Sequence, residues 1–134
     1  GTGAAPCPRH AALVASLREQ GLLADPRAAS AMAATDRAAF VPPGIAAAED
    51  AFVYDDAPLP LGHAATISAP HMHAVALDLL ADVISRTASP RVLDIGAGSG
   101  YLVAALAELG GDGAVVVGVE HVPALVRWAR GALL

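Results

Sequence analysis

Residues 90–134 alternate between short apolar runs of strand type and helical patterns, and this order limits the possible folds more than any other feature of the chain. Residues 91–95 (RVLDI) and 114–120 (AVVVGVE) have the length and the branched apolar content of buried parallel strands. A helical pattern follows each strand, over residues 101–109 and from Val122 to the C-terminus. This alternation is typical of the opening half of a parallel, doubly wound α/β domain.

The part of the chain before residue 90 has the pattern of helices around one irregular connection. Apolar spacing predicts helices over residues 10–20, 26–34 and 70–84. Asp25 is the expected N-cap of the second helix. Residues 40–62 hold four prolines and two glycines, so we expect an irregular, functional loop there. The residues of the third helix that we expect to face the core are Met72, Val75, Ala76, Leu79, Leu80 and Val83.

Composition predicts one domain with a core of small side chains. The chain has 134 residues, of which 55% are hydrophobic and 16% charged, so it can bury a core. Alanine supplies much of the apolar fraction and aromatic residues supply only 4%. We therefore expect helices that pack closely through alanine, with leucine and valine as the larger core residues.

Charge, cysteine content and apolar run length exclude several classes of protein. The formal net charge of −5 argues against a nucleic-acid partner, which needs clustered basic residues. Cys7 is the single cysteine, so an internal disulfide is excluded. No apolar run reaches the ~18 residues that a membrane-spanning helix needs. We expect a cytoplasmic protein without a nucleic-acid or membrane partner.

The glycine turn of residues 96–100 (GAGSG) joins the first strand to its helix. Glycines at such a turn accept unusual backbone angles and let a ligand approach free helix N–H groups. The dinucleotide motif is G-x-G-x-x-G, whereas this turn is G-x-G-x-G followed by the bulky Tyr101. With Asp94 before it, the turn resembles the first motif of class I S-adenosylmethionine methyltransferases. The alternative is a purely structural bend.

Glu120 ends the second strand and supports a nucleoside-containing ligand. It lies about 20 residues beyond the glycine turn, the spacing expected of a carboxylate that accepts hydrogen bonds from ribose hydroxyls. The alternative is a capping or solvent-facing glutamate.

A longer segment is more specific than either feature. Residues 66–74 (TISAPHMHA) closely resemble the signature of the protein-L-isoaspartate O-methyltransferase family. Residues 34–42 (ATDRAAFVP) resemble the segment that precedes the signature, and residues 118–126 (GVEHVPALV) resemble the end of the second strand in that family.

This resemblance implies both a fold and a reaction. The fold would be the α/β, Rossmann-like class I methyltransferase fold, truncated after the second strand–helix unit and carrying an N-terminal helical extension. The cofactor would be S-adenosyl-L-methionine. The reaction would be protein repair, in which a methyl group is transferred to the α-carboxylate of L-isoaspartyl residues in damaged proteins and peptides, the expected partners.

The resemblance also implies the site residues. Ser68 corresponds to the family's active-site serine, whose hydroxyl lies near the reacting carboxylate. That carboxylate is already an anion near neutral pH, so no strong base is required. The residues expected to bind the cofactor are Ala65, Thr66, Ile67, Ser68, His73, Asp94, Gly96, Gly98, Ser99, Gly100, Glu120 and His121, and no metal ligand is expected.

Simpler roles compete for several of these residues. Thr66 and Ser68 precede Pro70 and could cap the following helix. His71 and His73 could form a metal pair only in an extended segment, because residues two apart do not share a helix face. The sequence also predicts surface or loop positions for His10 and His63, packing for Trp128, and a solvated loop for Asp55 and Asp56.

The sequence predicts two parts of the chain and leaves three functions open. We expect residues 1–65 to form a helical segment with an irregular connection, and residues 66–134 to form the N-terminal half of a methyltransferase domain. Two strands would leave an apolar face and edge uncovered, which predicts poor solubility or pairing with another chain. The alternatives to the repair enzyme are a truncated, non-catalytic binding module and another class I methyltransferase that acts on a modified peptide.

Overall fold

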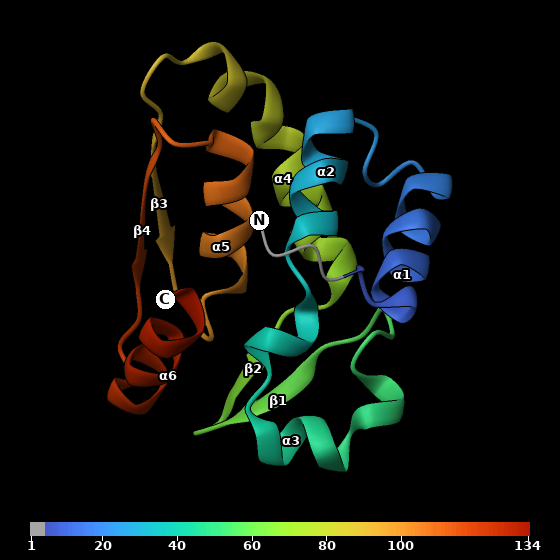
Figure 1. Cartoon of the computed structure of the whole chain (residues 1–134). Coiled ribbons are helices and arrows are strands. Elements are labelled where there is room, and N and C mark those ends of the chain that lie inside the picture. Colours follow the sequence, from blue (N-terminus) through green and yellow to red (C-terminus); the bar gives the residue numbers. More distant parts are fainter. Residues whose placement is uncertain (1–4) are drawn as a thin grey trace.

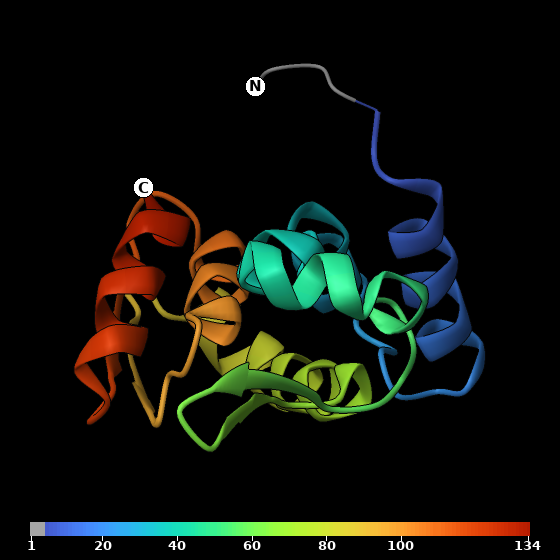
Figure 2. The same cartoon turned by 90° about the horizontal axis from the view of Figure 1, so that it is seen from below.

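Helices form most of the molecule in a computed structural model that describes residues 5–134 (Figure 1). The longer helices are α1 (Pro8–Glu19), α2 (Pro26–Ala34), α4 (Pro70–Arg86), α5 (Tyr101–Gly110) and α6 (Pro123–Leu133). Short helical turns lie between α2 and α4, namely η1 (Arg37–Phe40), α3 (Pro43–Ala48) and η2 (Asp50–Phe52). The strands are β1 (Leu59–Gly62), β2 (Ala65–Ile67), β3 (Arg91–Ile95) and β4 (Val115–Val119). Helices α1 and α6 lie at opposite ends of the molecule (Figure 2).

The core forms where α2, α4 and α5 meet, and it is built as the composition predicts. Ala28, Ala74, Ala81 and Ala105 are all 0% exposed, so the three helices approach closely. Leucines from α1, α4 and α5 fill the remaining space. Residues on both sides of the expected boundary after residue 65 contribute to this core, and the division of the chain there remains a prediction.

The ends of the first two helices follow local sequence. The Asp25 carboxylate accepts a 2.8 Å hydrogen bond from the Arg27 N–H, and Pro26 occupies the first turn of α2. Gly21 follows α1 with a φ of +75°, a conformation that glycine adopts without strain. The predicted helices and the predicted Asp25 cap are confirmed.

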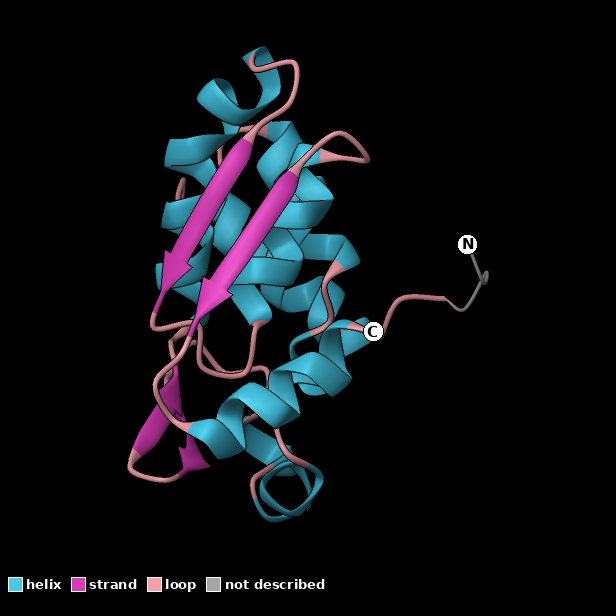
Figure 3. Ribbon diagram, turned by 90° about the vertical axis from the view of Figure 1, so that its left-hand side faces the viewer, coloured by secondary structure: helices cyan, strands magenta, loops and turns pink. Residues whose placement is uncertain are grey.

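The predicted strand–helix–strand–helix order is also confirmed. β3 and β4 pair in parallel, with Leu93 opposite Val117 and Ile95 opposite Val119, and α5 connects them. Figure 3 shows the helices packed behind one face of this sheet, while none of the helices or strands in the described part of the chain covers the other face. The glycine turn leaves β3 at its carboxyl end and leads directly into α5.

One face of each strand is exposed, which differs from the buried strands that their composition indicates but agrees with the uncovered face expected of a two-stranded sheet. Leu93, Ile95 and Val117 are 58%, 78% and 49% exposed. Side chains alternate between the two faces of a strand, and only one face of this sheet is covered within the described residues. The composition of a strand cannot show whether both of its faces have a partner.

The predicted buried face of α4 is wrong for most of its residues, although Leu80 is partly buried and packs against the core. Met72, Leu79 and Val83 are 57%, 76% and 57% exposed. The core contacts instead come from the opposite face of the helix, whose buried residues include His73, Ala74, Leu77, Ala81 and Ile84. Both faces of α4 carry apolar residues at helical spacing, and contact with α2 and α5 decides which one is buried.

The connection of residues 40–62 is more regular than predicted. Pro43 begins α3, because proline is well suited to a first helical turn. β1 pairs with β2 as an antiparallel hairpin, with Leu59 opposite Ile67. Its turn places Gly62, His63 and Ala64 at positive φ. Among residues 5–134, none of the helices combines the length and apolar character that a membrane crossing needs.

Candidate functional site

A cavity of about 290 Å³ lies between the glycine turn, β2 and the first turns of α4. β3 delivers its carboxyl end to one side of the cavity, and the hairpin delivers the Thr66–Ser68 segment to the other. The lining residues are Thr66, Ile67, Ser68, Met72, His73, Ala76, Asp94, Ile95, Gly96, Ala97, Gly98, Ser99, Tyr101 and Leu102.

Most of the residues that the sequence predicts for the site meet in this cavity. Those that line it are Thr66, Ile67, Ser68, His73, Asp94, Gly96, Gly98 and Ser99. Ala65, Gly100, Glu120 and His121 do not line it. The lining residues come from two stretches, residues 66–76 and residues 94–102. The hairpin and the turn between β3 and α5 bring these stretches together.

The glycine turn has the backbone conformation that its sequence indicates. Gly96, Gly98 and Gly100 have φ values of +84°, +57° and +89°, which L side chains rarely adopt. The N–H groups of Gly96 and Ala97 both donate to the Val119 carbonyl, at 2.7 and 3.0 Å. These bonds hold the turn against the end of β4.

Glu120 also holds the glycine turn in place through hydrogen bonds to its side chain. Its carboxylate accepts hydrogen bonds from the Val122 N–H at 2.8 Å and the Gly98 N–H at 3.1 Å. The bond from Val122, with that from Gly98, lowers the pKa of Glu120. Glu120 and Gly100 line a separate cavity of about 140 Å³ against α6, and the His121 side chain beside them is 92% exposed.

His73 and Tyr101 form a buried stacked pair at the wall of the main cavity. Their ring centroids lie 4.5 Å apart with 26° between the planes. The Tyr101 hydroxyl donates to the Thr35 carbonyl at 3.1 Å. Burial, aided by the charge of Arg37, lowers the pKa of His73 to about 4, so its imidazole is neutral near pH 7. Its Nδ1 atom is buried without a hydrogen-bond partner among the described residues.

The two hydroxyl residues of the signature do not cap α4. The N-cap position of α4 is Ala69, and no side chain caps the helix there. Instead, the Asp56 carboxylate accepts hydrogen bonds from the His71 backbone N–H at 2.8 Å and from its ring Nδ1 at 2.9 Å. Ser68 is exposed and lines the cavity, free of any capping role. The sequence predicts only a solvated loop position for Asp56, and the structure adds these bonds to the first turn of α4.

Asp94 supplies a carboxylate to the cavity. Partial burial raises its pKa above the ordinary value for aspartate. Its backbone is held in the sheet opposite Gly118. The cavity therefore combines a carboxylate, free hydroxyls and a neutral imidazole, a set able to bind a polar organic ligand. No group of three or more side chains able to hold a metal ion occurs in the described part of the chain.

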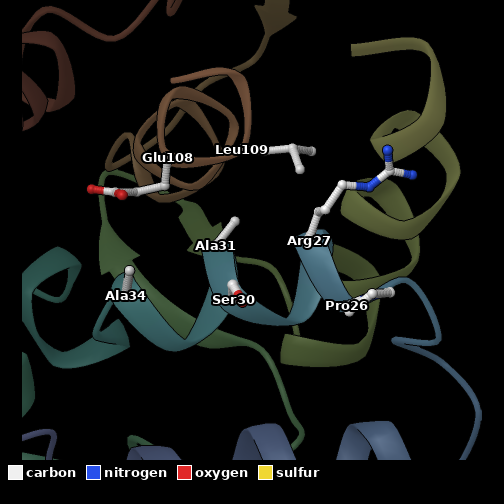
Figure 4. A pocket seen from close by; sticks show the side chains of 7 residues that line it. All are labelled: Pro26, Arg27, Ser30, Ala31, Ala34, Glu108 and Leu109. Atoms are coloured by element: carbon white, nitrogen blue, oxygen red, sulfur yellow. The ribbon is translucent and has the colours of Figure 1, made fainter. Parts of the chain in front are cut away.

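A larger hollow of about 570 Å³ lies between α2 and α5, away from the predicted residues. Arg27 and Glu108 lie at its two ends and point outward, while Ala31 and Ala34 face it from α2 (Figure 4). It lacks convergent polar groups, so the smaller cavity at the glycine turn is the candidate site.

The family model for protein-L-isoaspartate(D-aspartate) O-methyltransferase matches residues 8–133, almost the whole chain. The chain belongs to this family. A wheat (Triticum aestivum) protein-L-isoaspartate O-methyltransferase is 43% identical over 118 residues, covering 88% of this chain and 48% of the relative. Protein-L-isoaspartate O-methyltransferase 2 of Arabidopsis thaliana is 45% identical over 114 residues, covering 85% of this chain and 34% of the relative. The chain thus spans less than half the length of these curated relatives.

Solved structures of the isoaspartate methyltransferase family share the fold. A protein from Plasmodium falciparum, crystallised in complex with S-adenosyl-L-homocysteine, matches with a TM-score of 0.79 and 30% identity, covering 92% of this chain and 54% of that one. A second protein-L-isoaspartate O-methyltransferase matches with a TM-score of 0.71 and 25% identity. The likeness confirms the expected Rossmann-like α/β class I methyltransferase fold, of which this chain has the N-terminal helices and two strand–helix units.

Three residues of this family member play parts that the sequence did not predict. Tyr101 was conspicuous only as a bulky residue after the turn, yet it is 2% exposed and stacks on His73. His10, expected at the surface, is 1% exposed, and its Nε2 lies 2.9 Å from the Met32 carbonyl because α1 packs on α2. Arg37 is also 1% exposed and bonds to the Ser68 carbonyl at 2.8 Å. Its position in the ATDRAAFVP segment was the available signal.

Proposed function

We propose that the cavity at the glycine turn binds S-adenosylmethionine and supports transfer of its methyl group to the free α-carboxylate of L-isoaspartyl residues in damaged proteins and peptides. One observation carries the proposal. The family signature, Thr66–Ser68 and His73, lines the same cavity as the turn that follows β3. S-adenosyl-L-homocysteine, the product that S-adenosylmethionine leaves after methyl transfer, is bound to the related Plasmodium protein.

The residues present fit a ligand of this kind. His73 Nδ1 is buried and without a partner among the described residues, so a ligand group or a water beside it would satisfy this atom. Asp94 offers a carboxylate to a cationic amino group. The positive-φ glycines leave the turn without side chains where a ligand would approach the main chain.

Glu120 fits the ribose end of the cofactor while it keeps its present bonds. Each carboxylate oxygen has two acceptor positions, and the Gly98 and Val122 N–H groups use one on each oxygen. The second position on Oε1 can accept from a ribose hydroxyl, whereas His121 Nδ1 lies 3.3 Å from Oε2. His121, exposed beside Glu120, is the further cofactor contact that we propose, together with Ala65 and Gly100.

When bound, the cofactor supplies an electrophilic methyl group on a sulfonium ion. The task of this chain's own residues is to orient and desolvate the carboxylate that accepts the methyl group. Ser68, exposed at the cavity, can donate its hydroxyl hydrogen to one carboxylate oxygen and leave the other free to react. Ile67, 3% exposed, keeps water away from the inner side of the segment. We place this reaction in the cytoplasm, in accord with the single cysteine.

Methyl transfer to paired peptides tests the proposal. The purified chain is mixed with labelled S-adenosylmethionine and two peptides that differ only in an isoaspartyl or an aspartyl linkage, and base-labile methyl ester is counted. We expect ester on the isoaspartyl peptide alone. The Ser68→Ala chain should form at least about tenfold less ester, since loss of a hydrogen bond to a charged group costs roughly 1.5–3 kcal/mol.

Three other outcomes would reject the proposal in different ways. Equal methylation of both peptides would show a class I methyltransferase of another specificity. Cofactor binding without ester on either peptide would show a non-catalytic binding module. Absence of both binding and ester would remove the assignment of this cavity as a cofactor site in this chain.

A further inference from the structure

Arg37 is a buried cation that binds main-chain carbonyls instead of a carboxylate. It is the first residue of η1, separated by two residues from the end of α2 at Ala34, and it is 1% exposed. Burial lowers the pKa of its guanidinium to about 10, so the side chain stays charged near neutral pH. Burying a charge without a bonded counter-ion is costly, and a simple apolar core residue would avoid this cost.

The guanidinium ties three separate parts of the chain together. Its Nε donates to the Val53 carbonyl at 2.9 Å, its Nη1 to the Ser68 carbonyl at 2.8 Å, and its Nη2 to the Ala57 carbonyl at 3.0 Å. These acceptors come from the end of η2, the turn before β1 and the segment after β2. A planar fork of five N–H donors can reach all three at once, whereas a lysine ammonium group cannot match that geometry.

The residues beside Arg37 add to the same attachment. The Thr35 carbonyl accepts the hydroxyl hydrogen of Tyr101, which stacks on His73. The Asp36 carboxylate accepts the hydroxyl hydrogen of Tyr54 at 2.6 Å. Thr35 to Arg37 thereby link the two walls of the cavity, one carrying Ser68 and the other carrying Tyr101.

We propose that Arg37 is a positioning residue, which fixes the main chain at Ser68 and thereby sets the place of the Thr66–Ser68 wall of the cavity. The expected effect of Arg37 on cofactor binding rests on the function proposed above. The expected effect of Arg37 on the order of the Thr66–Ser68 segment does not depend on that function. Arg37 itself does not line the cavity, and of its three bonds the one to the Ser68 carbonyl reaches the cavity wall.

Two readouts on Arg37→Lys test the positioning role. The first is amide hydrogen exchange across residues 53–69, which we expect to become at least about tenfold faster. In the parent chain, local opening of this segment must break the three hydrogen bonds from Arg37 to main-chain carbonyls, and in the variant it need not. The second is the affinity for S-adenosyl-L-homocysteine measured by calorimetry, which we expect to fall about tenfold or more.

Leu17→Ala is the matched control. Leu17 is 0% exposed in α1, outside the segment that Arg37 holds, so this change lowers global stability without touching the cavity wall. Measurements are made where both variants are more than nine-tenths folded. Leu17→Ala should leave exchange at residues 65–69 and ligand affinity as in the parent chain.

Rescue separates positioning from a general folding role. In Arg37→Ala, millimolar guanidinium should restore exchange protection at residues 65–69, and it should do nothing for Leu17→Ala. Parent-like exchange in Arg37→Lys, or equal loosening in Leu17→Ala, would overturn the proposal. If the parent chain does not bind S-adenosyl-L-homocysteine, the cofactor function fails, and the exchange data still decide the role of Arg37.

Discussion

Gly118 lies in the middle of β4, where its lack of a side chain lets the glycine turn approach the sheet. A Cβ atom at this position would lie 2.8 Å from both Ala97 Cβ and Val103 Cγ2. Such distances are far shorter than normal carbon contacts. Glycine in a strand interior often marks a close approach of this kind, so Gly118 supports the site without lining its main cavity.

We therefore expect Gly118→Ala to destabilise the chain by about 1–3 kcal/mol through overpacking. Gly131→Ala is the control, because nothing lies within 4 Å of its added Cβ and alanine favours a helix by up to about 1 kcal/mol over glycine. Urea unfolding followed by circular dichroism measures both. Equal stability of the two variants would show that the turn yields to the extra methyl group.

The neutral state of His73 links stability to pH. Its pKa is lowered from 6.5 to about 4 in the folded chain. The stability from keeping this imidazole neutral is thus fully present above pH 6.5 and is lost as the pH falls through about 4.

His73→Phe keeps a ring against Tyr101 and removes the titrating group. Between pH 7 and pH 4 the parent chain should lose ~3 kcal/mol more unfolding free energy than this variant. Urea unfolding at a series of pH values measures the difference, and carboxylates common to both chains cancel. If the unfolding free energies of the parent chain and His73→Phe fall equally between pH 7 and pH 4, the assigned burial of the imidazole is contradicted.

At the scale of elements, α4 has two apolar faces and buries the one that the sequence did not favour. Leu77 is 0% exposed against the core, whereas Leu79, only two residues later, is 76% exposed. Leu77→Ala should cost about 2–5 kcal/mol of unfolding free energy. Leu79→Ala should stay within about 0.5 kcal/mol. Thermal unfolding of the pair measures this, and a reversed order would mean that α4 is rotated about its axis.

Local chemistry determines the parts of this fold that the sequence predicted. The Asp25 cap and the glycine turn depend on neighbouring residues and backbone angles, so they can be read directly from the chain. The same is true of the strand–helix order after residue 90. Resemblance to a family then placed Ser68 and His73 in one site, and both line the cavity.

Tertiary packing determines the parts that the sequence did not predict. The buried face of α4 depends on where α2 and α5 lie. The role of Arg37 depends on carbonyls 16, 20 and 31 residues away. Glu120 was expected at the ribose, and it also braces Gly98, a contact that spacing along the chain cannot reveal.

At the scale of the whole molecule, the parallel sheet is the least protected part. Among residues 5–134 it has two strands, so both are edges with unpaired main-chain groups. One face presents Leu93, Ile95, Val115, Val117 and Val119, each between 45% and 78% exposed. The open face of α4 adds Met72, Leu79 and Val83. Contiguous apolar surface of this kind favours association.

Self-association through the sheet face is the expected result. Leu93 and Val117 are directly paired across β3 and β4, and both are about half exposed, so Leu93→Thr with Val117→Thr lowers the apolar surface and keeps strand-forming residues. In sedimentation velocity the parent chain should grow in mass with concentration, and the double variant should do so less. Val116→Thr is the control, because Val116 packs against the core and its change should lower stability while leaving association intact. A parent chain that remains monomeric at every concentration would mean that strand twist and solvent tolerate this face uncovered.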